Sequence, residues 1–152
     1  MLTLVALSLV AFAEPDCDAK AMGAELAEAS PIAISRLYVE LVQCDAKAGK
    51  KHAGEALSRM LEGNESNEAV GAALSVGAAE EVRSWMDSLE PDQRSRTIRH
   101  LGTQCSSSEA AEQFLLESHE RLGSKFFEER FHRGLGDCRT AGIQALLKSA
   151  LE

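Results

Sequence analysis

Apolar residues recur along the chain at the spacing of amphipathic helices. Residues 34–42 carry apolar side chains at positions i, i+3, i+4, i+7 and i+8, which places them on one face of an α-helix. Residues 78–89 and 143–151 show the same helical spacing. No stretch alternates between apolar and polar residues for long enough to indicate a strand. The pattern therefore predicts an all-α protein.

Capping and turn residues divide this pattern into about nine helices. Ser30-Pro31 is typical of an N-cap followed by proline in the first helical turn. Ser106 and Glu109 have the spacing of a capping box, and Pro91 marks a break near the middle of the chain. Lengths of about three turns and short linkers favour antiparallel neighbours. We predict helices over residues 17–28, 31–43, 46–62, 66–75, 78–89, 92–103, 107–119, 122–134 and 139–151.

The cysteines mark an internal repeat. The run Cys-Asp-Ala-Lys-Ala occurs at residues 17–21 and again at 44–48, and Cys105 and Cys138 also precede alanine-containing stretches. Successive cysteines are 27, 61 and 33 residues apart, and the long interval has Gly77-Ala78-Ala79-Glu80 near its middle, where glycine replaces cysteine. The spacing predicts tandem antiparallel helix pairs with a period of 27–33 residues, the range of two-helix repeats.

Composition and charge narrow the class of protein. The 152 residues are enough for one domain with a modest core. Only 5% of them are aromatic, and the abundance of Ala and Leu favours helices over strands. The net charge of −8 disfavours nucleic-acid binding, because a polyanion would be repelled at long range.

The first residues have the features of an export signal. Residues 1–13 contain no charged side chain, end in the small-x-small pattern Ala-Phe-Ala, and are followed by the polar run Glu-Pro-Asp. The segment is shorter than the roughly 20 residues that span a bilayer. We therefore predict a secretory signal peptide over 1–13 and one helical domain over 14–152, in a secreted or periplasmic protein without a membrane span. A buried N-terminal helix is the alternative.

An oxidising compartment would pair the four cysteines. Three connectivities are possible, and sequence proximity favours Cys17–Cys44 and Cys105–Cys138. Equivalent positions on stacked helices lie about 8–10 Å apart, whereas a disulfide needs Cα atoms within about 7 Å. The favoured pairing therefore requires the junction loops to approach one another more closely than the helices do.

Motifs for chemistry are weak. His100, Cys105, His132 and Cys138 could supply a Cys2His2 zinc site, but zinc motifs usually have tighter spacing. The sequence contains no Gly-x-Ser-x-Gly, phosphate-binding loop or EF-hand spacing. We expect no metal and no cofactor, and we predict that the protein is not an enzyme.

The C-terminal third carries a family resemblance. His100-Leu101-Gly102 before Cys105, and the run Gly-Leu-Gly-Asp-Cys-Arg-Thr-Ala-Gly-Ile-Gln-Ala-Leu-Leu-Lys-Ser-Ala-Leu at 134–151, are similar to bacterial HEAT-type repeats. In that family a Leu-Gly-Asp turn precedes an Ala- and Leu-rich helix, although Cys138 stands where proline is common. The resemblance covers residues 98–151 and implies a short right-handed α-solenoid used for protein contact, with no catalytic residue.

Two basic segments and one aromatic residue are candidates for a binding face. Ordinary exposed helix faces and, for the aromatic residue, a core position are the alternatives. Our hypothesis is an exported interaction or scaffold module that holds a protein or peptide partner on a solenoid surface. A compact, disulfide-stapled helical bundle acting as an effector, inhibitor or lipid-binding protein is the competing hypothesis. The candidate partner-binding residues are Lys47, Lys50, Lys51, Arg94, Arg96, Arg99 and Phe126.

Overall fold

The computed structural model describes residues 17–60, 64–123, 125–126 and 134–150. Within these ranges the chain forms eight α-helices and no strand, which confirms the all-α prediction. The predicted signal segment 1–13 and most of the predicted helix 122–134 lie outside the described residues. The helices are α1 (Ala19–Glu28), α2 (Ile34–Cys44), α3 (Ala46–Arg59), α4 (Asn64–Ser75), α5 (Ala79–Asp87), α6 (Pro91–Gln104), α7 (Glu109–Leu122) and α9 (Ala141–Ser149).

The repeated Cys-Asp-Ala-Lys-Ala run forms the same helix start twice. In each copy the aspartate is the N-cap, and its carboxylate accepts hydrogen bonds from the amides two and three residues later. The distances are 3.1 and 2.9 Å for Asp18 at α1, and 2.8 and 3.0 Å for Asp45 at α3. The repeated motif is therefore a cysteine at a helix junction followed by a helix cap.

Two predicted N-caps, Ser30 and Ser106, were wrong by three and two residues. Helix α2 begins at Ile34 instead of Pro31, because the carbonyl of Ser30 accepts from the amides of Ala33 and Ile34 and closes a turn first. The N-cap of α7 is Ser108, whose hydroxyl accepts from the amide of Ala111 at 3.3 Å. Proline at residue 91 does begin a helix, where Glu90 and Gln93 form a capping box.

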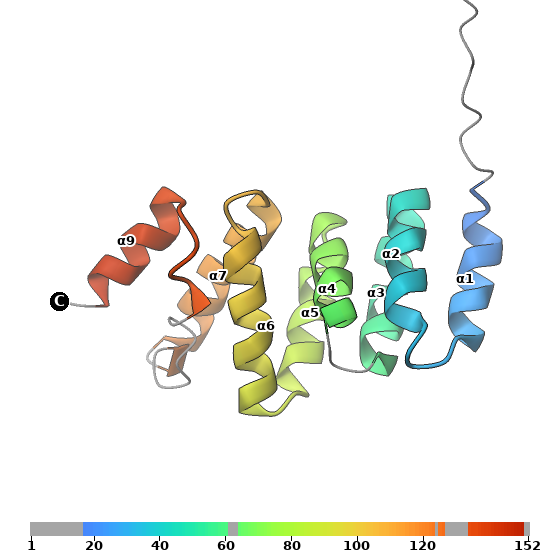
Figure 1. The fold of residues 1–152 in the computed structure, drawn as a ribbon, viewed down its shortest axis with the longest axis horizontal. Helices are drawn as coiled ribbons and strands as arrows, with labels where there is room; N and C mark the ends of the chain where they lie inside the picture. The colour runs from blue at the N-terminus through green and yellow to red at the C-terminus, as the bar shows by residue number, and fades with distance from the viewer. Residues whose placement is uncertain (1–16, 61–63, 124, 127–133, 151–152) are drawn as a thin grey trace, which may run out of the picture.

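The helices stand in two rows, and helices that are consecutive in the sequence run in opposite directions (Figure 1). Helices α2, α4 and α6 form one row, and α3, α5 and α7 form the other. Helix α1 packs on α2 and α3 at one end, while α9 packs on α7 at the other. Within the first row the helices begin 30 and 27 residues apart, and within the second row 33 and 30. These intervals agree with the predicted period.

The apolar residues of both rows form one continuous core. The small residues Ala69, Val70 and Ala73 are fully buried on α4, and the short side chains let its neighbours approach closely. The largest fully buried side chains come from helices of both rows and from the two terminal helices. They include Leu26, Tyr38, Leu41, Leu57, Ile98, Leu101, Leu115 and Ile143.

Polar contacts between distant parts of the chain join neighbouring repeats. The Arg59 guanidinium donates to the carbonyls of Leu26 and Ala29, 33 and 30 residues earlier, at 3.1 and 2.8 Å. The amide of Arg139 donates at 3.0 Å to the hydroxyl of Ser106, 33 residues earlier. Ion pairs between α5 and α7 join residues 34 apart. These contacts join α3 to the end of α1, α7 to α5, and the loop before α9 to the loop after α6.

Both favoured disulfides are present, so the predicted pairing is confirmed. Their Cα separations are 5.5 Å for Cys17–Cys44 and 5.7 Å for Cys105–Cys138. The stacking distance between helices is no obstacle, because one partner of each pair lies outside a helix. Cys17 precedes α1, and Cys138 lies in the loop before α9. Two disulfides indicate a non-cytoplasmic compartment.

The α4–α5 junction uses glycine for its backbone conformation. Gly77 has a φ of 77°, which favours glycine because a side chain would be strained there. Its amide donates to the carbonyl of Leu74, and the amide of Ala78 donates to that of Ala73, both at 3.0 Å. This is a Schellman motif. The junction therefore falls where the repeat predicted it, and its glycine ends a helix.

None of the described helices is long and apolar enough to cross a membrane.

A close backbone contact fixes the loop before α9 onto α6. A Cβ atom added at Gly102 would lie 2.0 Å from the carbonyl oxygen of Gly134, and one at Gly134 would lie 2.5 Å from the Cα of Arg99. Because the obstacles are backbone atoms, no side-chain rotation would relieve the clash.

Replacing Gly102 with alanine is expected to lower the free energy of unfolding by about 1–3 kcal/mol, the usual cost of overpacking. Gly136→Ala is the matched control, because nothing lies within 4 Å of a Cβ at that position. Urea denaturation followed by circular dichroism measures both. Equal stability of the two variants would show that the Gly102 contact is not formed.

Candidate functional site

A buried guanidinium joins α5 to α7. The Arg83 side chain is only 13% exposed and makes ion pairs with Glu80 and Glu117. Its guanidinium carbon lies 5.4 Å from the centre of the Phe114 ring, within the range of a cation–π interaction. Desolvation strengthens such contacts. Arg83 therefore fixes the distance between two helices of the same row.

A second ion pair crosses the same interface nearer the solvent. Arg121 donates from both terminal nitrogens to the Asp87 carboxylate at 3.3 Å, and the two side chains are 44% and 51% exposed. Between the two pairs lies a cavity of about 20 Å³, which also contacts Met86 and Ile98. It has room for about one water molecule, so this interface is structural and holds no larger ligand.

His100 is half-buried on α6, and its Nε2 lies 2.8 Å from the side-chain nitrogen of Gln104. Burial lowers the pKa of His100, and the nearby carboxylate of Glu68 partly offsets that effect. The cysteines of the conceivable zinc site are bonded to each other, and His132 lies outside the described residues. Among the residues that the structure describes, no three His, Cys, Asp or Glu side chains gather as metal ligands would.

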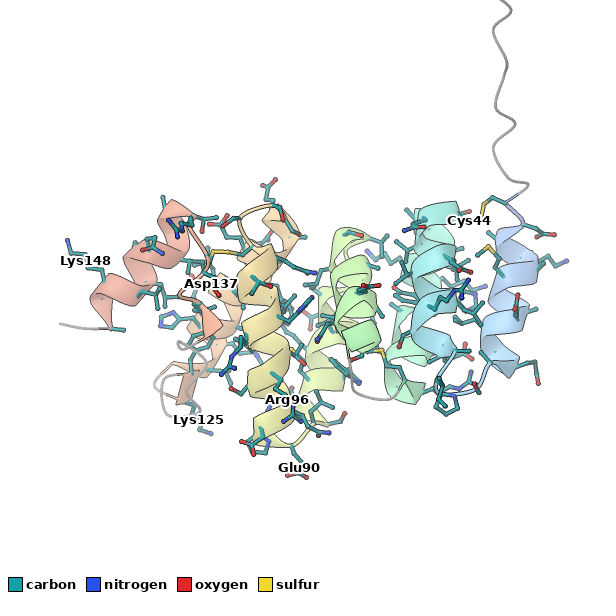
Figure 2. All side chains as sticks on the ribbon, in the orientation of Figure 1. Cys44, Glu90, Arg96, Lys125, Asp137 and Lys148 are labelled. Atoms are coloured by element: carbon teal, nitrogen blue, oxygen red, sulfur yellow. A yellow bond between two sulfur atoms is a disulfide. The ribbon has the colours of Figure 1, made fainter. Side chains whose placement is uncertain are left out.

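The two basic segments lie far apart. Lys47, Lys50 and Lys51 are exposed on the first half of α3, whereas Arg96 and Arg99 are exposed near the middle of α6. The two helices belong to different rows and begin at opposite edges of the molecule. Figure 2 labels Cys44, just before α3, at one edge and Glu90, just before α6, at the other. Arg94, the third predicted basic residue of α6, is half-buried and borders the small cavity between α5 and α7. The segments therefore form no common binding face.

The prediction that Phe126 is an exposed anchor was wrong. Its side chain is 0% exposed, and its ring meets His119 edge to face, with ring centres 5.4 Å apart. The prediction assumed one helix over residues 122–134. Gly123, with a φ of 54°, ends α7, and the amide of Phe126 donates to the carbonyl of Gly123 at 3.1 Å. Phe126 is consequently a core residue.

The outer face of the α3 row carries an open groove of about 600 Å³, here called the α3–α5 groove. Small residues one turn apart on each helix leave this space unfilled, and Trp85, 7% exposed, forms part of its floor. Glu80 and Glu81 are the charged lining residues. The groove can thus offer hydroxyl and carboxylate groups over an aromatic surface. Its lining residues are Gly54, Ser58, Glu80, Glu81, Ser84, Trp85 and Ser88.

The opposite row carries a smaller groove of about 400 Å³, here called the α2–α4–α6 groove. The small side chains of α4 in this groove, Gly71, Ala72 and Ser75, leave space at its centre. Val39 and Glu68 also line it. It contains no aromatic residue among its lining side chains. Each row therefore has a recess of its own, and the two differ in chemistry.

Comparison of the chain with protein-family models, with curated proteins and with solved structures gives no significant match. The case for a functional surface therefore depends on the geometry of the grooves.

Sequence reasoning missed both the Arg83 ion pairs and the α3–α5 groove. A signal for the former was available, since Arg83 and Glu117 stand 34 residues apart, about one repeat period. The groove had a weaker signal: pairs of small residues at i and i+4 on both helices, such as Ser84 and Ser88. Such pairs indicate a recess only once the helices are known to be neighbours.

Replacing Arg83 with methionine should lower the free energy of unfolding by about 1–3 kcal/mol, because a partly buried, charge-assisted contact is lost. Arg121→Met removes the exposed pair and should cost less than about 1 kcal/mol. Urea denaturation of the two variants compares the costs directly. A larger loss at Arg121 would contradict the assignment of Arg83 as the main link between α5 and α7.

The lowered pKa of His100 predicts a pH dependence of stability. The unfolded chain, with an ordinary pKa of 6.5, binds the proton more readily than the folded protein. The contribution of neutral His100 to stability is therefore present above pH 6.5 and is lost as the pH falls below that value.

When the pH is lowered from 7.5 to about 5.5, the His100→Gln variant should lose less stability than the wild type, and thermal unfolding at both pH values would measure the difference. Glu68→Gln should lose more, because it removes the charge that raises this pKa. Identical pH profiles for the three proteins would refute the assignment.

Proposed function

We propose that the protein is an exported, non-enzymatic interaction module whose helix pairs form a short right-handed α-solenoid of the HEAT type. In this proposal the α3–α5 groove holds a protein or peptide partner. The observation that carries it is the open recess over Trp85 on the outer face of one row. Export is supported by the two disulfides and by the signal-like residues 1–13, and would lead to a secreted or periplasmic protein.

The arrangement of contacts supports the solenoid. In such proteins each repeat contacts its neighbours, and the stacked helices leave extended outer surfaces for partners. Here the disulfides and the long-range side-chain hydrogen bonds join residues 27–34 apart in the described chain. The elongated double row in Figure 1 has the same character, with the first and last helices at opposite ends.

The groove lining supports a particular kind of partner. Four of its seven lining residues are glycine or serine, so an extended segment or a helix could approach the backbone closely. Its charged lining residues are Glu80 and Glu81, and the protein has a net charge of −8. Complementary charge favours a segment that carries lysine or arginine. The predicted binding residues of α3 and α6, including Lys51 and Arg96, lie outside this groove and would belong to other contacts.

Filling the groove should abolish partner binding. Ser84 is exposed and lines the groove, so Ser84→Trp would occupy it without disturbing the core. Ser75→Trp is the matched control, since Ser75 is an exposed serine of the other row's groove. Tagged proteins are used for affinity capture from the source organism, with quantitative mass spectrometry. We expect the wild type and Ser75→Trp to recover the same partner proteins. The recovered amount of these proteins should be at least tenfold lower with Ser84→Trp.

Two results would overturn the proposal. One is a set of captured proteins that Ser84→Trp retains in full. The other is loss with Ser75→Trp alone, which would assign binding to the opposite row. Circular dichroism of both variants checks that the helices are intact.

A further inference from the structure

The two disulfides differ in their access to solvent. Cys105 and Cys138 are 2% and 0% exposed and belong to the hydrophobic core. By contrast, Cys17 is exposed and Cys44 is half-buried. Cys44, labelled in Figure 2, lies at the C-terminal end of α2. A thiolate must reach a sulfur atom along the S–S axis to displace its partner. One disulfide is therefore open to attack and the other is enclosed.

The accessible disulfide holds a terminal helix that buries few of its residues. Helix α1 has ten residues and buries only Gly23 and Leu26. A helix of that length is marginal in water without tertiary support. At its C-terminal end the Arg59 guanidinium binds the carbonyls of Leu26 and Ala29, while the Cys17–Cys44 bond holds the N-terminal end. The attachment at the N-terminal end of α1 is therefore covalent and reducible.

The other terminal helix is protected from the same chemistry. Helix α9 has nine residues and also buries two, Ile143 and Leu146. Its adjoining disulfide is covered by the core, and the Cys138 sulfur lies 3.4 Å from the Thr140 hydroxyl. The difference between the two ends of the row thus lies in sulfur exposure and not in helix length.

We propose that Cys17–Cys44 is a site of thiol–disulfide exchange that latches α1 onto the helix row. A small thiolate attacks the exposed Cys17 sulfur and forms a new S–S bond with it, and the Cys44 sulfur leaves with the electron pair as a thiolate. A second thiolate attacks the mixed disulfide, which frees the Cys17 thiolate and yields the oxidised form of the small thiol. Each cycle consumes two thiols and delivers two electrons to the protein disulfide.

Opening the latch would change one end of the molecule. Helix α1 covers the outer flank of α2 and α3, as Figure 1 shows. Once released at its N-terminal end, α1 would exchange its amide hydrogens rapidly and uncover part of that flank. The remainder of the row, held by its own core and by the enclosed disulfide, would stay folded. The inference concerns α1 alone and stands apart from the proposed groove.

Reduced glutathione, as the small thiol, tests the site on the full oxidised chain. Samples taken over time are quenched with acid, alkylated and mapped by mass spectrometry. We expect glutathione on Cys17 and alkylated Cys44 to appear at least tenfold faster than any modification of Cys105 or Cys138. Hydrogen exchange on the same samples should show loss of protection in residues 19–28 while residues 141–149 remain protected.

The double variant Cys17→Ser with Cys44→Ser provides a second readout. It should show rapid exchange in residues 19–28 without any thiol, and glutathione should cause no further change there. Equal rates of modification at the two disulfides would overturn the proposal. So would full protection of residues 19–28 after the Cys17–Cys44 bond is cleaved, because α1 would then need no latch. The wild-type kinetics decide the first point even if the variant fails to fold.

Discussion

Each helix of this protein buries its apolar face against helices about one repeat period away, and the rest of the structure depends on that constraint. Each described helix buries its apolar face by packing on other helices, so the two rows share one continuous core. Residues about 30 positions apart then lie side by side at every level of packing. The disulfides at 27 and 33 residues and the Arg83–Glu117 ion pair at 34 are consequences of that arrangement. Outer surfaces remain on both rows, which is why the grooves lie there.

Much of the fold could be predicted because its signals are local or periodic. The apolar spacing predicted the all-α class, and the cysteine spacing predicted both disulfides. Helix starts were less predictable, because alternative caps compete over a few residues. Ser106 and Ser108 can each cap the same helix, and the loop before α9 decides between them by donating the Arg139 amide to Ser106. That contact comes from 33 residues away and leaves no local trace.

The candidate site was less predictable than the fold, and Phe126 shows why. Its exposure was inferred from its position on a predicted helix over residues 122–134, whereas its ring packs against His119 of the preceding helix α7 and is fully buried. The basic segments were assigned correctly to helices, but charge along the chain carries no information about which row a helix joins. A groove is a property of two helices together. Its residues become recognisable only when α3 and α5 are known to be neighbours.

The spacing of the helices changes along the second row, where α3 and α5 pack closely and a wider gap separates α5 from α7. Helices α2 and α4 are closely packed, as are α4 and α6, whereas α5 and α7 are not among the closely packed pairs of the described residues. The wider gap is bridged by long side chains: Arg83 reaches Glu117 and Arg121 reaches Asp87. Arginine suits this role, because its planar guanidinium binds a carboxylate and stacks on an aromatic ring at once. Close packing thus joins the helices of the first row and also α3 to α5, whereas ion pairs bridge the gap between α5 and α7.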